Sequence, residues 1–152
     1  MNISSPAFNE GEMIPKQYSR DGGDKSPPLQ IEDVPDKTKS LVLIMDDPDA
    51  PGGTFTHWIL FNVSPATKEI HEDGPPVMAT QGKNDYGNIG YGGPQPPSGE
   101  HRYFFRLFAL DTVLSLSRGV KRGEVEAAMQ GNILDEAELV GRYASTQMAT
   151  AR

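Results

Sequence analysis

Cysteine is absent from this sequence of 152 residues. Its absence excludes disulfide bonds and thiolate chemistry, because both require the cysteine sulfur. Neither a covalent framework nor a cysteine nucleophile can therefore contribute to the fold or the function. A chain without cysteine is compatible with oxidising and reducing surroundings alike, so this absence leaves the compartment open.

Positive charge is scarce. The chain has 14 lysine and arginine residues against 21 aspartate and glutamate residues, which gives a formal net charge of −7. A surplus of negative charge repels nucleic-acid backbones and anionic lipid surfaces, and it argues against both as partners. Any anion that this protein binds must therefore be held by a local pocket.

Long apolar segments are missing as well. No run approaches the roughly 20 apolar residues that a membrane-spanning helix needs. The opening segment "MNISSPAFNEG" has neither the basic region nor the apolar region of a secretory signal. We therefore expect a cytoplasmic protein, or a mature chain whose leader has been removed, with no integral membrane association.

Glycine and proline, in contrast, are abundant. The 16 glycines and 13 prolines together approach a fifth of the chain, which favours many turns and short strands over long helices. The length suits one hydrophobic core, and no repeat, low-complexity tract or long linker divides the chain. We predict a single domain over residues 1–152.

Three segments have the pattern of β-strands. Residues 40–45 (SLVLIM) form a continuous apolar run, which fits a strand buried on both faces. Residues 56–64 and 101–111 alternate apolar and polar residues, as half-buried strands do. The residues predicted to share one face are His57, Ile59, Phe61 and Val63 in the first of these, and Tyr103, Phe105, Leu107 and Ala109 in the second.

The end of the chain has the pattern of two helices. Residues 122–131 and 133–145 both repeat apolar residues at helical spacing, and Gly131 is suited to end the first. The repeating residues are Val125, Ala128 and Met129 in the first segment, and Ile133, Ala137 and Val140 in the second. We predict a mainly β fold with two C-terminal helices packed on it.

Polar side chains that folding does not require adjoin all three strands. The aspartates that follow the first strand, in a loop that two prolines make rigid, are Asp46, Asp47 and Asp49. His57 begins the second strand, and His101 and Tyr103 begin the third on one face. Each place alone also has a structural interpretation: a solvated turn, a half-buried histidine at a sheet edge, and an ordinary strand end.

Taken together, these residues favour one small cavity. If the strands lie in one sheet, both imidazoles meet the aspartate loop at the same end of the core. Two protonatable rings suit a phosphate or carboxylate group, and the amides of Gly92 and Gly93 have no side chain to shield them from an oxyanion. The prolines that would form stiff walls are Pro94, Pro96 and Pro97.

Two longer motifs run through these candidates. An apolar strand followed by Asp-Pro-Asp-Ala-Pro and then His-Trp is present as "LIMDDPDAPGGTFTHW", and a Gly-Pro-rich turn leading into His-Arg-Tyr is present as "YGGPQPPSGEHRYFF". In both motifs the chain resembles the phosphatidylethanolamine-binding proteins, specifically their bacterial and archaeal Raf-kinase-inhibitor-like branch. Further similarity in "GEMIPKQYSRDG", "NDYG" and "MQGNIL" extends the resemblance over nearly the whole chain.

The resemblance implies a large antiparallel β-sheet packed with a smaller sheet, C-terminal helices, a homodimer, and a small pocket for phosphate-type anions. Carried onto this sequence, the ligand-binding residues are Asp47, His57, Gly93, Pro94, His101 and Tyr103, with Asp49 and Trp58 in support. The resemblance also suggests the hypothesis that the Ala50–Pro51 peptide bond is cis. Many prokaryotic relatives have a cysteine where this chain has Gln95 and another near the position of Arg20, and both are missing here, so redox behaviour tied to those thiols is not expected.

Three classes of function fit these residues. The first is a non-enzymatic binding protein, without catalytic residues, metal or cofactor, that holds phosphoethanolamine, a phospholipid head group or another phosphorylated ligand and modulates a kinase or protease partner. The second is a metal-dependent or hydrolytic enzyme using the His/Asp cluster, with Ser98 as the nearby hydroxyl. The third is an interaction protein whose pocket is vestigial or buried by a partner, in which the loop aromatics Tyr86 and Tyr91 contribute to a dimer or pack locally.

Overall fold

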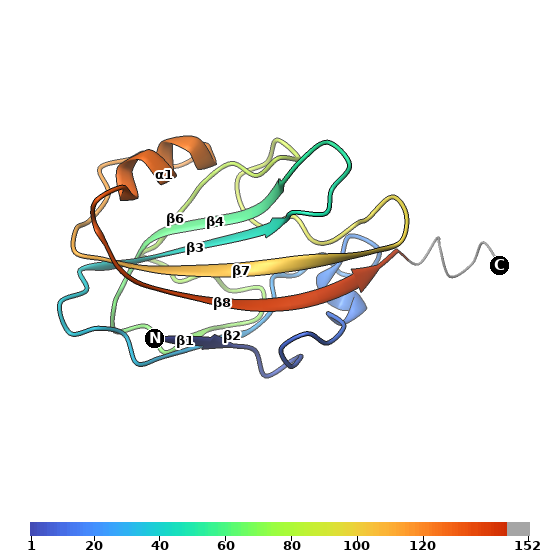
Figure 1. Cartoon of the computed structure of the whole chain (residues 1–152), viewed down its shortest axis with the longest axis horizontal. Helices are drawn as coiled ribbons and strands as arrows, with labels where there is room; N and C mark the ends of the chain where they lie inside the picture. The colour runs from blue at the N-terminus through green and yellow to red at the C-terminus, as the bar shows by residue number, and fades with distance from the viewer. Residues whose placement is uncertain (146–152) are drawn as a thin grey trace.

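The computed structural model describes residues 1–145. Its main feature is a five-stranded antiparallel sheet in the order β6-β4-β3-β7-β8. The strands are β3 (Ser40–Asp47), β4 (Phe55–Val63), β6 (Thr80–Gln81), β7 (Glu100–Leu110) and β8 (Ile133–Ala144). Figure 1 shows β7 and β8 running side by side across the length of the molecule.

A smaller antiparallel sheet packs on one face of this large sheet. Its order is β1-β2-β5, built from β1 (Asn2–Ser4), β2 (Leu29–Glu32) and β5 (Glu69–Ile70). In Figure 1 it lies below the large sheet. The predicted architecture, a mainly β fold with a large and a small sheet, is therefore confirmed. Residues 146–152 of the predicted domain lie outside the described residues.

The large sheet has a hydrophobic core on each face. Its inner face packs against the small sheet, so Leu43 of β3 shares a cluster with Ile31 of β2. Its outer face packs against the single α-helix of residues 1–145, α1 (Arg122–Met129), so Ile44 shares a second cluster with Val125. Every residue of β3 is buried, which confirms the prediction that residues 40–45 form a strand covered on both sides.

The prediction for residues 122–131 is also confirmed. Val125 and Met129 are the buried residues of α1. The helix ends at Met129, and Gly131 follows with φ +83, a left-handed conformation that glycine adopts without steric cost. A short 3₁₀ helix, η1 (Lys16–Tyr18), lies near the opposite end of the large sheet, and no helix in residues 1–145 has the length and hydropathy needed to cross a bilayer.

The second predicted helix is wrong, because residues 133–144 form strand β8. This strand pairs with β7 along its whole length, from Leu110 opposite Ile133 to Glu100 opposite Ala144. The helical spacing of a few apolar residues was outweighed by the backbone groups of β7, which need a partner. Gly141 faces the core where a β-carbon would lie 2.6 Å from the Ile14 side chain, so its small size permits the close packing.

Candidate functional site

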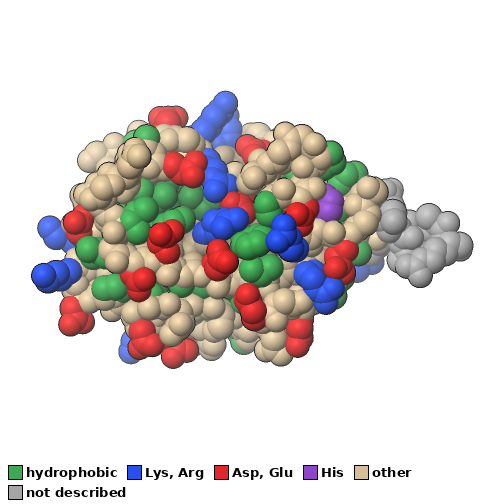
Figure 2. All heavy atoms as spheres, viewed as in Figure 1, with side chains coloured by type: hydrophobic (Ala, Val, Ile, Leu, Met, Phe, Trp, Pro, Cys, Tyr) green, Lys and Arg blue, Asp and Glu red, His purple; other side chains and the backbone are tan. Residues whose placement is uncertain are grey.

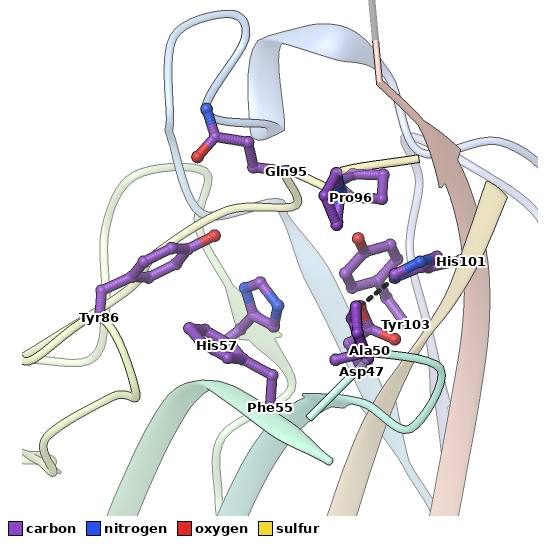
Figure 3. Close-up of a pocket in the computed structure, with 11 residues that line it drawn as sticks. Asp47, Ala50, Phe55, His57, Tyr86, Gln95, Pro96, His101 and Tyr103 are labelled. Atoms are coloured by element: carbon purple, nitrogen blue, oxygen red, sulfur yellow. Dashed lines mark hydrogen bonds and ion pairs between the residues drawn. The ribbon is translucent and has the colours of Figure 1, made fainter. Parts of the chain in front are cut away.

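A cavity of about 220 Å³ opens at one end of the large sheet. It lies where β3 ends and β4 and β7 begin, and the loop after Tyr86 passes over it (Figure 3). Cavities that hold drug-sized ligands usually measure about 300–1,000 Å³, so this one has room for a small group only. We call its eleven lining residues the cup: Asp47, Ala50, Pro51, Phe55, His57, Tyr86, Gln95, Pro96, Pro97, His101 and Tyr103.

The aspartates at the end of β3 point to opposite faces of the sheet. The strand was predicted to end at residue 45, but it extends two residues farther and includes both Asp46 and Asp47. Side chains alternate along a strand, so Asp47 follows Met45 on the inner face and lines the cup. Asp46 faces outward and binds Arg106 and Arg122 instead.

A β-bulge in β4 sets the position of His57. Met45 pairs with Trp58, and the next residue, Asp46, pairs with Thr56, so His57 is one residue in excess of the regular register. A bulge places two successive residues on nearly the same face. His57 therefore lies on the inner face with Trp58, where its ring meets that of Tyr103 at a centroid distance of 5.3 Å.

The bulge overturns the predicted faces of this strand. His57 was expected to share a face with Ile59 and Phe61, but these two belong to the outer core beneath α1. Val63 was expected there too and packs in the inner core, beyond a second register shift. Simple alternation would have turned His57 away from the cavity, so the irregular strand is what makes it a cup residue.

His57 has a fixed tautomer. Its Nδ1 lies 2.6 Å from the carbonyl oxygen of Gly92, and the Gly92 amide donates back to the His57 carbonyl at 2.9 Å. A carbonyl oxygen can only accept, so Nδ1 carries a proton and Nε2 is left for the cavity. Burial lowers the pKa of His57, and this outweighs the Gly92 carbonyl and the nearby charge of Asp47, which both raise it.

His101 is paired with Asp47. The Nδ1 atom of His101 donates to Oδ2 of Asp47 at 2.6 Å, and the other carboxylate oxygen accepts the backbone N–H of Asp49 at 2.8 Å. Both oxygens of this carboxylate are thus engaged by the protein. The pairing fixes the His101 ring, in the way that a carboxylate orients a histidine in many sites, and leaves its Nε2 without a hydrogen bond to any residue in 1–145.

Tyr103 has the least satisfied polar group in the cup. Its side chain is 0% exposed, and its hydroxyl has no hydrogen-bond partner among the described residues. Burial, and secondly the charge of Asp47, raise the pKa of the phenol, so it is a proton donor at neutral pH. The Asp47 carboxylate is close enough to contribute to this shift, but it does not meet the geometry of a hydrogen bond with the hydroxyl. Figure 3 shows the phenol between His57 and His101 and below Pro96.

Asp49 connects the aspartate loop to β7 and does not line the cup. Its carboxylate accepts from the Arg102 backbone N–H at 2.9 Å and from the guanidinium at 2.8 and 3.0 Å. These hydrogen bonds from Arg102 lower the pKa of Asp49 to about 2. Trp58 lies behind the cup, where its Nε1 donates to Gln81 at 3.0 Å.

The Ala50–Pro51 bond is trans, so the cis hypothesis is wrong. The loop reverses through the turn of residues 50–53, closed by a 3.1 Å hydrogen bond from the Gly53 amide to the Ala50 carbonyl. Proline in the second position and glycine in the fourth are typical of a type I turn, which needs no cis bond.

Gly93 and Pro94 are not among the lining residues of the cup. The Gly93 amide donates to Asp24 at 2.7 Å, and the Gly92 amide is taken by His57. The expectation that these two amides face an anion is therefore not met. Their role is structural: a β-carbon on Gly93 would lie 2.4 Å from the Tyr18 carbonyl oxygen, so glycine lets the loop pack closely.

Two aromatic side chains of the cup were not predicted. Phe55 and Tyr86 contact each other with ring centroids 4.8 Å apart, and each also contacts His57, at 4.9 and 5.5 Å. Tyr86 is fixed by donating its hydroxyl to the Gly93 carbonyl at 2.8 Å. Phe55 could have been found from its place two residues before His57, whereas nothing local connects Tyr86 to the cavity.

The enzymatic alternative gains no support from these contacts. Within residues 1–145 there is no group of three His, Cys, Asp or Glu side chains placed to hold a metal ion. Ser98 is exposed and does not line the cup. The lining side chains that carry polar atoms are those of Asp47, His57, Tyr86, Gln95, His101 and Tyr103. Within residues 1–145 the ones without a hydrogen bond are His57 Nε2, His101 Nε2, Tyr103 Oη and the exposed Gln95 amide at the rim.

Known proteins resemble this chain over nearly its full length. A family model described as "Phosphatidylethanolamine-binding protein" matches residues 4–144. UPF0098 proteins of Methanothermobacter thermautotrophicus and Aquifex aeolicus are 50% and 51% identical, covering 94% of this chain and 98% and 88% of those proteins.

Two solved structures are similar as well. A phosphatidylethanolamine-binding protein homologue from Chlamydia trachomatis has a TM-score of 0.91 and 45% identity, covering 95% of this chain and 97% of its own. E. coli YbcL, described as a member of the mammalian family of the same name, has a TM-score of 0.88 and 30% identity, with coverages of 94% and 97%.

Proposed function

The chain belongs to the phosphatidylethanolamine-binding protein family, and we propose that it is a non-enzymatic binding protein whose cup receives a phosphate-type group. The ligand would be phosphoethanolamine, the head group of a phospholipid, or another small phosphorylated molecule. Membership of the family supports a binding protein, and the contacts within the cup support the rest.

The observation that carries the proposal is the unpaired hydroxyl of Tyr103. A buried polar group without a hydrogen bond costs roughly 1–3 kcal/mol, and such groups in folded proteins usually have a partner. An anionic oxygen in the cavity would accept this hydrogen bond. Because the hydroxyl lies in the same cavity as His57 and His101, the same ligand would contact all three side chains.

The charges around the cavity are compatible with an anion. Asp47 is the one acidic residue that lines the cup, and both of its oxygens already accept hydrogen bonds. In its imidazolium form His101 neutralises this carboxylate and can donate from Nε2. The ligand oxygen therefore meets donors rather than a bare carboxylate, despite the net charge of −7.

The rest of the proposal concerns the setting of the protein. We extend it to a cytoplasmic homodimer that modulates a protein kinase or protease when its cup is occupied, as the family resemblance implies. Charged side chains of both signs are interspersed over the face shown in Figure 2, without a large basic patch, which supports a small ligand rather than a nucleic acid. Sedimentation velocity would test the dimer directly.

The experiment is a titration with phosphoethanolamine followed by NMR of the histidine rings. We expect the signals of His57 and His101 to move while those of His71, on an exposed turn, stay in place. Tyr103→Phe should weaken binding about 3- to 10-fold through the lost hydrogen bond. The matched control is Tyr143→Phe, which removes a phenol bonded to Ser19 and Asp21 and should leave affinity unchanged. If millimolar phosphoethanolamine moves neither ring, the proposal is wrong.

A further inference from the structure

The polar atoms of the cup differ in hydrogen-bonding character. His57 presents Nε2, and this atom is an acceptor whenever the ring is neutral, because the single proton resides on Nδ1 against the Gly92 carbonyl. Tyr103 presents a hydroxyl that no acceptor in residues 1–145 uses. The cavity thus has an acceptor on one side and a free donor on the other.

The surroundings of His57 keep its ring neutral. Three aromatic rings enclose it: Phe55 from β4, Tyr86 from the loop and Tyr103 from β7. The carboxylates whose charge favours protonation are Asp46, Asp47 and Asp85. Asp46 faces the opposite side of the sheet and is neutralised by two arginines, Asp47 is paired with His101, and Asp85 accepts the Thr56 amide. Burial therefore prevails, and the ring is 3% exposed.

Figure 3 shows how the histidine rings lie around the cavity. The two ring nitrogens of His57 point in different directions, one to the loop above and one toward Tyr103 and Asp47. His101 lies on the far side of the cavity with its Nδ1 bonded to Asp47. A fully ionised anion would place an oxygen lone pair against the lone pair of His57 Nε2, which is repulsive. An anion that carries one hydrogen would satisfy it.

We propose that the cup selects a phosphomonoester in its singly protonated form, with the P–OH group donating to His57 Nε2. The remaining phosphate oxygens accept from Tyr103 and from the Nε2 of His101 in its imidazolium form, in which both ring nitrogens are donors. This inference rests on the proposed function and specifies the protonation state of the ligand, and it makes His57 the residue that distinguishes phosphate esters from sulfate esters. A sulfate monoester has the same shape and no hydrogen to donate.

The test compares methyl phosphate with methyl sulfate by isothermal titration calorimetry at pH 6.5. The second pKa of a phosphomonoester is about 6, so roughly a quarter of the methyl phosphate is singly protonated and matches methyl sulfate in charge and shape. We expect this form to bind about tenfold more tightly than methyl sulfate, the difference between a satisfied and an unsatisfied acceptor, so the affinity for total methyl phosphate should be about 2.5-fold higher than for methyl sulfate. Equal affinity, or a preference for methyl sulfate, would overturn the inference.

The position of the proton can be observed directly. In ¹⁵N-labelled protein saturated with methyl phosphate, His57 should keep the signals of a neutral ring protonated at Nδ1. An imidazolium pattern on binding would contradict the inference, because His57 would then be a donor. His57→Phe should lower the preference for singly protonated methyl phosphate over methyl sulfate from about tenfold to below about twofold, since it removes the acceptor. If this variant does not fold, the calorimetric comparison of the two esters and the ¹⁵N signals of His57 in the wild-type protein still test the inference.

The outcomes separate this inference from the proposed function. Binding of both esters with equal affinity would overturn the selection for a protonated phosphate and leave the phosphate-type binding site in place. Binding of neither ester would overturn both. Binding of methyl phosphate alone, with a neutral His57, is the expected result.

Discussion

Asp46 and Asp47 are neighbours on β3, and they occupy two very different environments. Asp46, on the outer face, is 0% exposed and accepts hydrogen bonds from Arg106 at 2.9 and 3.2 Å and from Arg122 at 2.7 Å. Asp47, on the inner face, pairs with His101 at the edge of a cavity. The charges of the outer cluster are paired with one another, whereas in the cup a phenol and two imidazole nitrogens have no hydrogen bond within residues 1–145.

This difference distinguishes polar groups that stabilise the fold from polar groups that are free to bind a ligand. A buried carboxylate held by two guanidinium groups satisfies itself, and it fixes the sheet to α1 because Arg122 is the first residue of that helix. The cup has the opposite character. The Nδ1 atoms of His57 and His101 are hydrogen-bonded to the protein, while their Nε2 atoms face no protein partner within residues 1–145. Residues fixed in this way are suited to bind a ligand with little reorganisation.

The largest expected effect comes from replacing each aspartate by alanine. Asp46→Ala should lower the free energy of unfolding by about 3 kcal/mol, because it leaves two arginines in a partly buried site without their counter-charge. Asp47→Ala should cost about 1–2 kcal/mol through the unpaired His101 and should abolish phosphoethanolamine binding. Urea unfolding and calorimetry on both variants measure the two effects. Loss of phosphoethanolamine binding with unchanged stability in Asp46→Ala would contradict the assignment of a structural role to the outer face and a binding role to the inner face.

The second effect is a pH dependence of stability caused by His57. Burial lowers its pKa in the folded protein below the ordinary value of 6.5, so below about pH 6.5 the unfolded chain binds more protons than the folded one. Stability therefore decreases as pH falls through this window. His57→Gln should remove this part of the pH dependence, and His71→Gln, at an exposed turn, should retain it. Urea midpoints at pH 7.5, 6.5 and 5.5 provide the comparison, and identical pH profiles for all three proteins would contradict it.

The smallest effect is expected at the rim of the cup. Asp49→Asn removes the charge that pairs with the exposed Arg102 but keeps an oxygen to accept its amide. Exposed ion pairs contribute little to stability, so the urea midpoint should hardly change, while a looser loop should weaken phosphoethanolamine binding by about twofold. The pairing of Asp49 should contribute most above its unfolded pKa of 3.8 and should be lost as pH falls through about 2. A large loss of stability would contradict this expectation, because it would mean that the Asp49–Arg102 pair stabilises the fold as strongly as the buried Asp46 cluster does.

Much of the site follows from the sequence because its residues are close to strand ends. Asp47, His101 and Tyr103 could be placed by alternation alone, and the structure brings them into one cavity together with His57. His57 was found for an incorrect reason, since regular alternation would have turned it outward. Tyr86 could not be assigned, because its contact with the cup depends on how a loop folds back over β4.

The sequence by itself determined the strands with a clear apolar pattern, the burial of residues 40–45 on both faces, the first helix of the C-terminal region and the family. Local side-chain periodicity and motif spacing are sufficient for these features. Only the tertiary structure decided that residues 133–144 pair with β7, that a bulge turns His57 inward, and that the Gly92 carbonyl sets its tautomer. Each of these depends on hydrogen bonds between segments far apart in the chain, and no local pattern encodes them.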